Sequence, residues 1–494
     1  MQPEGALEHD ELKRRASAGV FIVATRGAAI LLLGFAGNVV IARLLTPHDF
    51  GAVAIGMSVI VFGSLIADGG LGGGLIRRVE PPAREELEAL LALQLGITTA
   101  FTVVAAAIGS MFGEIGLITA LMVSSLPLVA LQFPGRILLE RSLSYRPLAV
   151  VEVCTVIAYH CWAIGLVLAG LGVWGLASAT IAMRVVGAMT MFWVCRSSLL
   201  WPRFSWRLIQ PLLGFGVRFQ AVNGTWLARD QGLNAAIAAI GGVATLGLWS
   251  LAKRVMEIPA LLFESFWRVS FPAMSQLLAA KQDVKPLIER AVGMAAIASG
   301  ILLTGLAGSA AGLIPAVFGE SWQEASDVIP LACLGVMIGG SVGVATVGYL
   351  YAVGDASAVL RAGICQAAAW IAVTLLLLPF VGVSAAGVGW LVSSVVEAVV
   401  LGRATSKWTD VRLVAPLVAP TLLGAVSIAF GWAIAALGGD DLLAGVVGGS
   451  CAVLCFVSGL IVFRRKLLLE TFSFALGSMR AAASRPAAST GTVA

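Results

Sequence analysis

Long apolar runs dominate the chain, and short polar connections separate them. A helix of about twenty apolar residues crosses about 30 Å of hydrocarbon, so each run is long enough to span a bilayer. The continuous runs disfavour a transmembrane β-barrel, because the strands of a barrel alternate apolar and polar residues. The pattern therefore predicts an all-α polytopic membrane protein with about 14 transmembrane helices. The expected spans cover residues 17–43, 51–75, 88–111, 115–133, 148–171, 173–195, 212–239, 243–270, 288–317, 327–352, 358–380, 383–403, 413–437 and 442–463.

The distribution of lysine and arginine orients these spans. Of the 32 cations, 24 lie in the terminal segments, in every second connection or at the span ends that adjoin those connections. The alternate connections hold none outside the spans, and two of them are acidic, with Glu320 and Asp441 as examples. Cytoplasmic loops of membrane proteins carry the excess of Lys and Arg. We therefore expect an even number of spans, with the N and C termini both cytoplasmic.

The other eight cations lie inside the expected spans. A charge at the bilayer centre costs at least about 2.5–3.5 kcal/mol, so each of these residues must face water or a partner. Their positions are the strongest functional signal in the sequence. The eight residues are Arg26, Arg43, Arg184, Arg218, Arg229, Lys253, Arg254 and Arg268.

The eighth span carries a stripe of polar residues on one helical face. Its members follow 3-4-3-4 spacing, and Lys253 borders it. Two compatible interpretations of this face remain open. It lines a cavity, or its charges form ion pairs within the helix, Lys253 with Glu257 and Glu264 with Arg268. Pro259 interrupts the helix and favours a kink or hinge. The stripe consists of Arg254, Glu257, Leu261, Glu264 and Arg268.

Other intramembrane charges have similar alternatives. Arg26 lies about nine residues inside the first span, too deep to snorkel easily, and either lines a cavity or pairs with Asp68 or Glu264. Arg184 has Glu152 and Glu397 as alternative partners. In the seventh span, Gln220, Asn223, Asp230 and Asn234 share one face, and Arg218 and Arg229 share the opposite one.

Composition narrows the function class. Apolar residues make up 59% of the 494 residues and charged residues only 12%, with a mean hydropathy of +0.96. This composition excludes a secreted enzyme, a nucleic-acid binder and a disordered scaffold. The connections are too short for a soluble domain, and no Ser/His/Asp set, HExxH or GxxxxGK[ST] motif occurs. We therefore expect no enzyme, no cofactor and no metal site, and we interpret the seven cysteines as packing residues.

A weak internal repeat divides the chain. A shift of 196 residues aligns Asn38 with Asn234, Gly51 with Gly247, and the acids Asp68 and Glu264. A shift of 215 aligns residues 172–174 with 387–389. Transporters are often built from such repeats. The expected organisation is an N-terminal tail (1–16), an N-lobe of six spans (17–211), a C-lobe of six spans (212–410), spans 13 and 14 (411–466) and a cytoplasmic tail (467–494).

Several short strings together resemble the polysaccharide transporter family of bacterial oligosaccharide flippases, of the colanic-acid and exopolysaccharide exporter type. The resemblance covers about residues 12–460. The strings are ARLLTPHDFG at 42–51, DGGLG at 68–72, LIRR at 75–78, LERSLSYRP at 139–147, GVWGL at 172–176, LGLWS at 246–250, FPA at 271–273 and FGESW at 318–322.

This resemblance implies two six-helix lobes around a central cavity lined by spans 1, 2, 7 and 8. It implies a flippase of the bacterial cytoplasmic (inner) membrane that moves polyprenyl-pyrophosphate-linked oligosaccharides outward by alternating access. Its partners would be the lipid-linked oligosaccharide and polymerase or glycosyltransferase machinery, not nucleic acid. Cavity cations would hold the pyrophosphate. The expected substrate-binding residues are Arg26, Arg254, Lys253, Arg268 and Arg229, and the coupling or gating candidates are Asp68, Asp230, Glu257 and Glu264.

Two other functions remain open. An ion-coupled exporter of small molecules, of the related multidrug type, would use the intramembrane acids as anchors. A membrane-embedded glycosyltransferase or polymerase is disfavoured by the short connections, because such enzymes normally need a sizeable external loop or domain.

Overall fold

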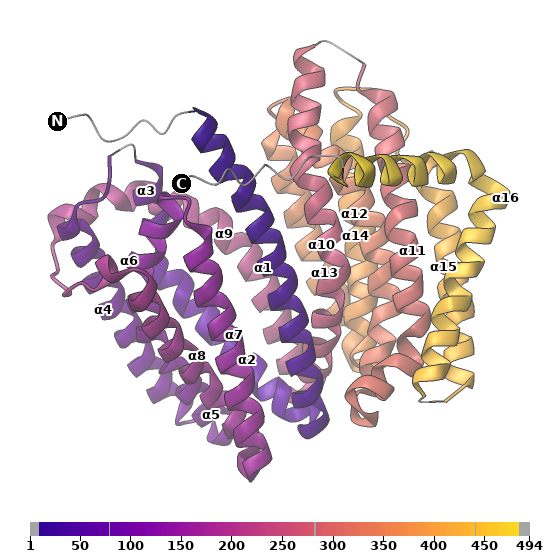
Figure 1. Cartoon of the computed structure of the whole chain (residues 1–494). Coiled ribbons are helices and arrows are strands. Elements are labelled where there is room, and N and C mark those ends of the chain that lie inside the picture. The colour runs from indigo at the N-terminus through magenta and orange to yellow at the C-terminus, as the bar shows by residue number, and fades with distance from the viewer. Residues whose placement is uncertain (1–8, 79, 281–282, 440, 484–494) are drawn as a thin grey trace, which may run out of the picture. The chain divides into compact units, whose positions relative to one another are not determined.

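The computed structural model describes residues 9–78, 80–280, 283–439 and 441–483 (Figure 1). All regular elements in these ranges are helices, which confirms the expected all-α class. The chain divides into two compact units, residues 1–250 and 251–494, and each is described here by itself. The lobe boundary expected at 211/212 stays a prediction.

In the N-terminal unit, α1 packs against α7, α7 against α8, and α4 against α5 and α6, while α9 packs on α2, α3 and α4. The first residues of α10 complete the unit. A π-helical turn at Val167–Leu171, with Gly170 at φ 88°, separates α7 from α8. The helices are α1 (His9–Leu44), α2 (Pro47–Asp68), α3 (Leu71–Arg77), α4 (Arg84–Gly109), α5 (Gly113–Val123), α6 (Leu126–Arg141), α7 (Tyr145–Leu166), α8 (Gly172–Val194), α9 (Trp206–Gly241) and α10 (Val243–Ala279).

The C-terminal unit contains the rest of α10 and six further helices. Helix α11 contacts α12, α15 and α16, and α14 contacts both α12 and α13. Helix α16 bends at Arg464, near the expected end of the last span (Figure 1). Beyond the bend, Glu470 pairs with Arg290 of α11 at 3.1 Å. The helices are α11 (Lys285–Phe318), α12 (Val328–Ala352), α13 (Ala356–Val381), α14 (Ser384–Thr405), α15 (Val414–Leu437) and α16 (Leu442–Ala483).

Each expected span has a helical counterpart in the described chain. Two spans are divided, 51–75 into α2 and α3, and 115–133 into α5 and α6. Among the described residues, ten segments are long and apolar enough to cross a membrane, and one of them, Tyr145–Val194, contains both α7 and α8. The three remaining spans correspond to α1, α9 and α10. These three helices carry most of the expected intramembrane charges, which lower their hydropathy.

Small residues bring α11, α15 and α16 into close contact. A Cβ atom on Gly448 of α16 would lie 2.5 Å from the carbonyl oxygen of Gly431 and 2.7 Å from that of Gly308. In a bilayer there is little hydrophobic force between helices, so close packing of small residues supplies much of the association free energy. These glycines therefore set the helix spacing in the C-terminal unit.

We predict that Gly448→Ala lowers the thermal unfolding midpoint of the purified protein, because the new methyl group must displace two backbone segments. Overpacking of this kind costs about 1–3 kcal/mol. The matched control is Gly343→Ala in α12, where the new Cβ has no atom within 4 Å. The control should leave the midpoint unchanged or raise it, since alanine restricts the unfolded chain. Equal midpoints for the two variants would contradict the packing argument.

Candidate functional site

Arg26 of α1 forms an ion pair inside the N-terminal unit. Its Nε atom lies 3.1 Å from Oε2 of Glu152, which comes from α7, and both side chains are partly exposed. This partner differs from Asp68, which the sequence offered; the other expected partner, Glu264, has a side chain outside the described residues, so that pairing stays a prediction. The Glu152 carboxylate compensates the positive charge of Arg26, which would be costly inside the membrane without a partner. Its guanidinium has further N–H groups that Glu152 Oε2 does not use.

The polar residues of α9 divide between a pair on the helix itself and contacts to α2. Arg229 donates from Nε to Asp230 Oδ1 at 2.8 Å. Gln220 donates to the carbonyl oxygen of Leu65 at 2.8 Å, and Asn234 donates to Ser58 Oγ at 3.4 Å. The face that carries Gln220 and Asn234 therefore packs on α2. Asn223 and Arg218, which the sequence placed on the two faces, have side chains outside the described residues.

The internal repeat is visible as a contact between the N-terminal ends of α2 and α10. A Cβ on Gly51 would clash with the carbonyl oxygen of Val243, and a Cβ on Gly247 would clash with that of Pro47. Positions 47 and 243 differ by 196, as do 51 and 247. The two contacts are therefore equivalent under the repeat, within residues that all belong to the N-terminal unit. Only glycine allows the two backbones to approach this closely.

Asp68 marks a break in the second expected span. Helix α2 ends at Asp68, and Gly69 and Gly70 both adopt left-handed conformations, with φ 51° and 70°. Helix α3 then begins at Leu71. The Asp68 carboxylate accepts a hydrogen bond from the Gly70 N–H. Helix α2 is by itself long enough to cross a membrane, so the candidate coupling residue lies at the C-terminal end of a full-length helix.

The candidate residues of α10 that lie beyond Ser250 belong to the C-terminal unit. Lys253 and Arg254 are partly buried, and Glu257 is exposed. Helix α10 runs over Val243–Ala279, so it continues through Pro259. The side chains of Glu264 and Arg268 lie outside the described residues. The structure thus assigns Arg26, Asp68, Arg229 and Asp230 to one unit, and Lys253, Arg254 and Glu257 to the other.

Arg184 is a second buried arginine of the N-terminal unit, which sequence reasoning set outside its preferred site. Its Nε atom is buried and has no hydrogen-bond partner among the described residues. Of the two expected partners, Glu152 pairs with Arg26, and Glu397, in the C-terminal unit, accepts a hydrogen bond from Gln366 at 2.7 Å. The two expected pairings of Arg184 stay predictions.

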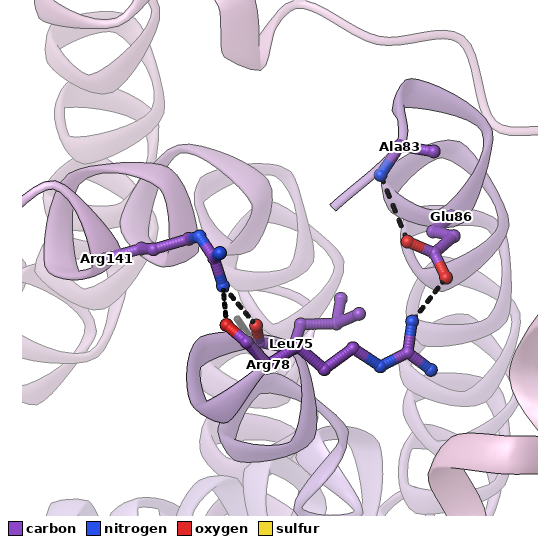
Figure 2. Close-up of polar contacts among 5 residues, drawn as sticks. All are labelled: Leu75, Arg78, Ala83, Glu86 and Arg141. Atoms are coloured by element: carbon purple, nitrogen blue, oxygen red, sulfur yellow. Dashed lines mark hydrogen bonds and ion pairs between the residues drawn. The ribbon is translucent and has the colours of Figure 1, made fainter. Parts of the chain in front are cut away.

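Two of the strings that carry the family resemblance meet in space. Figure 2 shows Arg141, at the end of α6, donating to the carbonyl oxygens of Leu75 and Arg78 at 3.1 and 2.6 Å. Arg78 in turn pairs with Glu86 at 2.7 Å, and Glu86 accepts from the Ala83 N–H at the start of α4. The arginine thus satisfies carbonyl groups at the end of α3, which have no helical donor. LIRR and LERSLSYRP therefore contribute to one structural joint.

We predict that Arg141→Ala destabilises the N-terminal unit by about 1–3 kcal/mol, the usual value of hydrogen bonds from a charged donor. Arg141→Lys should recover only part of the lost stability, because the lysine ammonium lacks the planar fork of donors that a guanidinium offers. Arg136→Ala is the control on the same helix, since its pair with Glu140 is largely exposed and worth little. Thermal unfolding of the purified variants measures the difference. A loss for Arg136→Ala as large as that for Arg141→Ala would contradict the joint.

Comparison with known proteins finds two curated relatives. The chain is 23% identical over 349 residues to the lipopolysaccharide biosynthesis protein WzxC of Escherichia coli (strain K12), covering 65% of this chain and 67% of that protein. It is 25% identical over 309 residues to the succinoglycan biosynthesis transport protein ExoT of Rhizobium meliloti (strain 1021), covering 60% of this chain and 61% of that protein.

Two solved structures share the fold. The structure of the lipid II flippase MurJ in an inward closed conformation matches 91% of this chain and 100% of that chain, with a TM-score of 0.70 and 12% identity. An inward-facing multidrug resistance MATE family transporter of the MOP superfamily matches 77% of this chain and 96% of that chain, with a TM-score of 0.54 and 17% identity. Residues 40–327, more than half of the chain, match the family described as "Polysaccharide biosynthesis protein". The chain is a multi-pass membrane protein that belongs to this polysaccharide biosynthesis family.

Proposed function

We propose that the protein moves polyprenyl-pyrophosphate-linked oligosaccharide units across the cytoplasmic membrane by alternating access, for the synthesis of surface polysaccharide or exopolysaccharide. The observation that carries this proposal is the family match over residues 40–327 in a chain with arginines inside its membrane helices. The names of the relatives support it, because one is a transport protein of succinoglycan biosynthesis and another acts in lipopolysaccharide biosynthesis.

The proposed orientation has both termini in the cytoplasm of a bacterial cell. The alternation of Lys and Arg between the connections supports it. In this orientation, the connection that carries Glu320 faces the outside of the cell. A cysteine placed at Glu320 should react with an impermeant maleimide added to intact cells, and labelling from the cytoplasm alone would reverse the topology.

The proposed binding groups are five of the eight intramembrane cations. Two, Arg26 and Arg229, belong to the N-terminal unit, and three, Lys253, Arg254 and Arg268, belong to the C-terminal unit. A substrate pyrophosphate carries roughly two negative charges, and each charge-assisted hydrogen bond contributes about 1.5–3 kcal/mol. Glu152 would hold the Arg26 side chain in place while its remaining N–H groups meet the phosphate. Asp68, Asp230, Glu257 and Glu264 are the proposed coupling or gating residues.

An ion-coupled exporter of small molecules is the second candidate. The intramembrane carboxylates favour it, since Asp68 lies at a helix break and Asp230 lies on α9. This function needs an anionic anchor for a cationic drug, whereas the flippase needs cationic anchors for phosphate. Arginine substitutions therefore separate the two: they abolish polysaccharide export in the first case and leave drug export intact in the second.

We predict that a strain lacking this gene loses its surface polymer and accumulates the lipid-linked precursor on the cytoplasmic side. Complementation with the wild-type gene should restore the polymer, and Arg254→Ala should restore about one tenth or less at equal abundance. The measurements are polymer released from the cell surface and precursor extracted from the membrane. Normal polymer output in the deletion strain, with no redundant exporter, would contradict the proposal.

The pair Arg26–Glu152 allows binding to be distinguished from structural support. Arg26→Ala leaves Glu152 unpaired and should lower the abundance of folded protein. In the double variant Arg26→Ala with Glu152→Gln, abundance should recover while export stays about tenfold lower, because the phosphate contact is still missing. Arg43→Ala, on the same helix near its outer end, is the control and should export normally. Full export by the double variant at normal abundance would show that Arg26 serves structure alone.

A further inference from the structure

The connection between α8 and α9 exposes large apolar side chains, although connections between helices are normally polar. It covers residues 195–205 and contains one 3-10 turn, Arg196–Ser198. Clustered apolar surface of this kind marks a site of interaction with another molecule. In this connection and the first residue of α9, four such side chains are more than half exposed, namely Leu199 (66%), Trp201 (77%), Phe204 (62%) and Trp206 (53%).

The backbone of this connection is held in place from the inside. Ser198 is buried, and its Oγ atom donates to the carbonyl oxygen of Cys195 at 2.6 Å. The Arg203 N–H donates to the carbonyl oxygen of Glu88, in α4, at 3.3 Å. The side chain of Leu200 packs against an apolar cluster formed by α3, α4, α6 and α9. The fold itself therefore turns the aromatic side chains outward.

The exposed surface of the connection is positively charged. Residues 195–210 contain three arginines, Arg196, Arg203 and Arg207, and no acidic residue. All three arginines are exposed. The Nε atom of Arg203 lies 4.0 Å from Oε2 of Glu88, whose other oxygen pairs with Arg84 at 3.0 Å. One carboxylate thus faces two guanidinium groups, so the surface keeps a net positive charge and favours an anionic partner.

The position of the connection selects the kind of partner. Helix α8 lies in a segment able to cross a membrane and ends at Val194, directly before the connection. The connection therefore lies where hydrocarbon gives way to headgroups, a layer in which tryptophan is enriched and anionic lipids attract cations.

We propose that residues 196–207, the surface segment, bind the anionic phospholipid headgroups of the adjoining leaflet. The aromatic rings enter the boundary between headgroups and acyl chains, and the arginines contact lipid phosphates. This contact does not depend on the transported substrate, so it goes beyond the proposed function. It fixes the height of α8 and α9 relative to the membrane surface.

Fluorescence quenching in lipid nanodiscs tests the surface segment in the full-length protein. The variant Leu199→Cys carries a fluorophore, and the wild type, treated in the same way, is the blank for the native cysteines. Nitroxide-labelled lipids should quench this fluorophore, phosphatidylglycerol about twofold or more strongly than phosphatidylcholine at equal mole fraction. A water-soluble quencher should act weakly. Asp410→Cys is the control, because that side chain is 90% exposed, and its fluorophore should respond strongly to the water-soluble quencher.

Further substitutions separate the charged and the aromatic contributions. Arg196→Gln with Arg207→Gln should make quenching by the two lipids equal, whereas Arg361→Gln, which removes an exposed cation of α13, should keep the preference. Trp201→Ser with Phe204→Ser should increase quenching from water. Thermal unfolding midpoints equal to that of the wild type confirm that each variant is folded.

Two results would overturn the proposal. The first is a fluorophore at Leu199 that is quenched from water as strongly as the one at Asp410 and not by nitroxide lipids, which would leave the aromatic surface to a protein partner. The second is an unchanged preference for phosphatidylglycerol in the folded variant that lacks Arg196 and Arg207.

Discussion

A charged or polar group inside hydrocarbon must find a partner or water, and this constraint organises the N-terminal unit. Arg26 reaches across to Glu152, and Arg229 pairs with its neighbour Asp230. Gln220 donates to a carbonyl oxygen of α2. Each contact joins two helices or stabilises one, so these polar residues hold the unit together. The compensation is incomplete at Gln94 Oε1 and Arg184 Nε, which have no hydrogen-bond partner among the described residues.

The break between α2 and α3 shows how the same constraint shapes local structure. Unwinding at Gly69 and Gly70 frees backbone groups that a continuous span would satisfy internally. The structure uses Gln220 on one side of the break and Arg141 at the far end of α3 to satisfy carbonyl oxygens. Asp68 lies at the C-terminal end of α2, just before the two left-handed glycines.

The sequence predicted the helices well and the partners poorly, for a physical reason. Apolar runs are local signals, so the fourteen spans correspond to helices, and the repeat at a shift of 196 reappears as the paired contacts of Gly51 and Gly247. Ion pairs depend on how distant helices pack, so the pairing of Arg26 with Glu152 was not foreseen. Gln94 escaped notice because a lone glutamine in an apolar run has no periodicity of its own. The Gly-Gly pair after Asp68 was the one local signal for the helix break.

Reconstitution into liposomes tests the central claim most directly. Purified protein, inserted in vesicles that carry a polyprenyl-pyrophosphate-linked oligosaccharide in the inner leaflet, should deliver the sugar to the outer leaflet, where an added glycosidase cleaves it. Vesicles with the double variant Arg26→Ala and Arg254→Ala should deliver far less at equal protein content. If wild-type vesicles leave the sugar protected while the same vesicles expel a small cationic dye along an ion gradient, the protein is an exporter of small molecules, and the flippase account is contradicted.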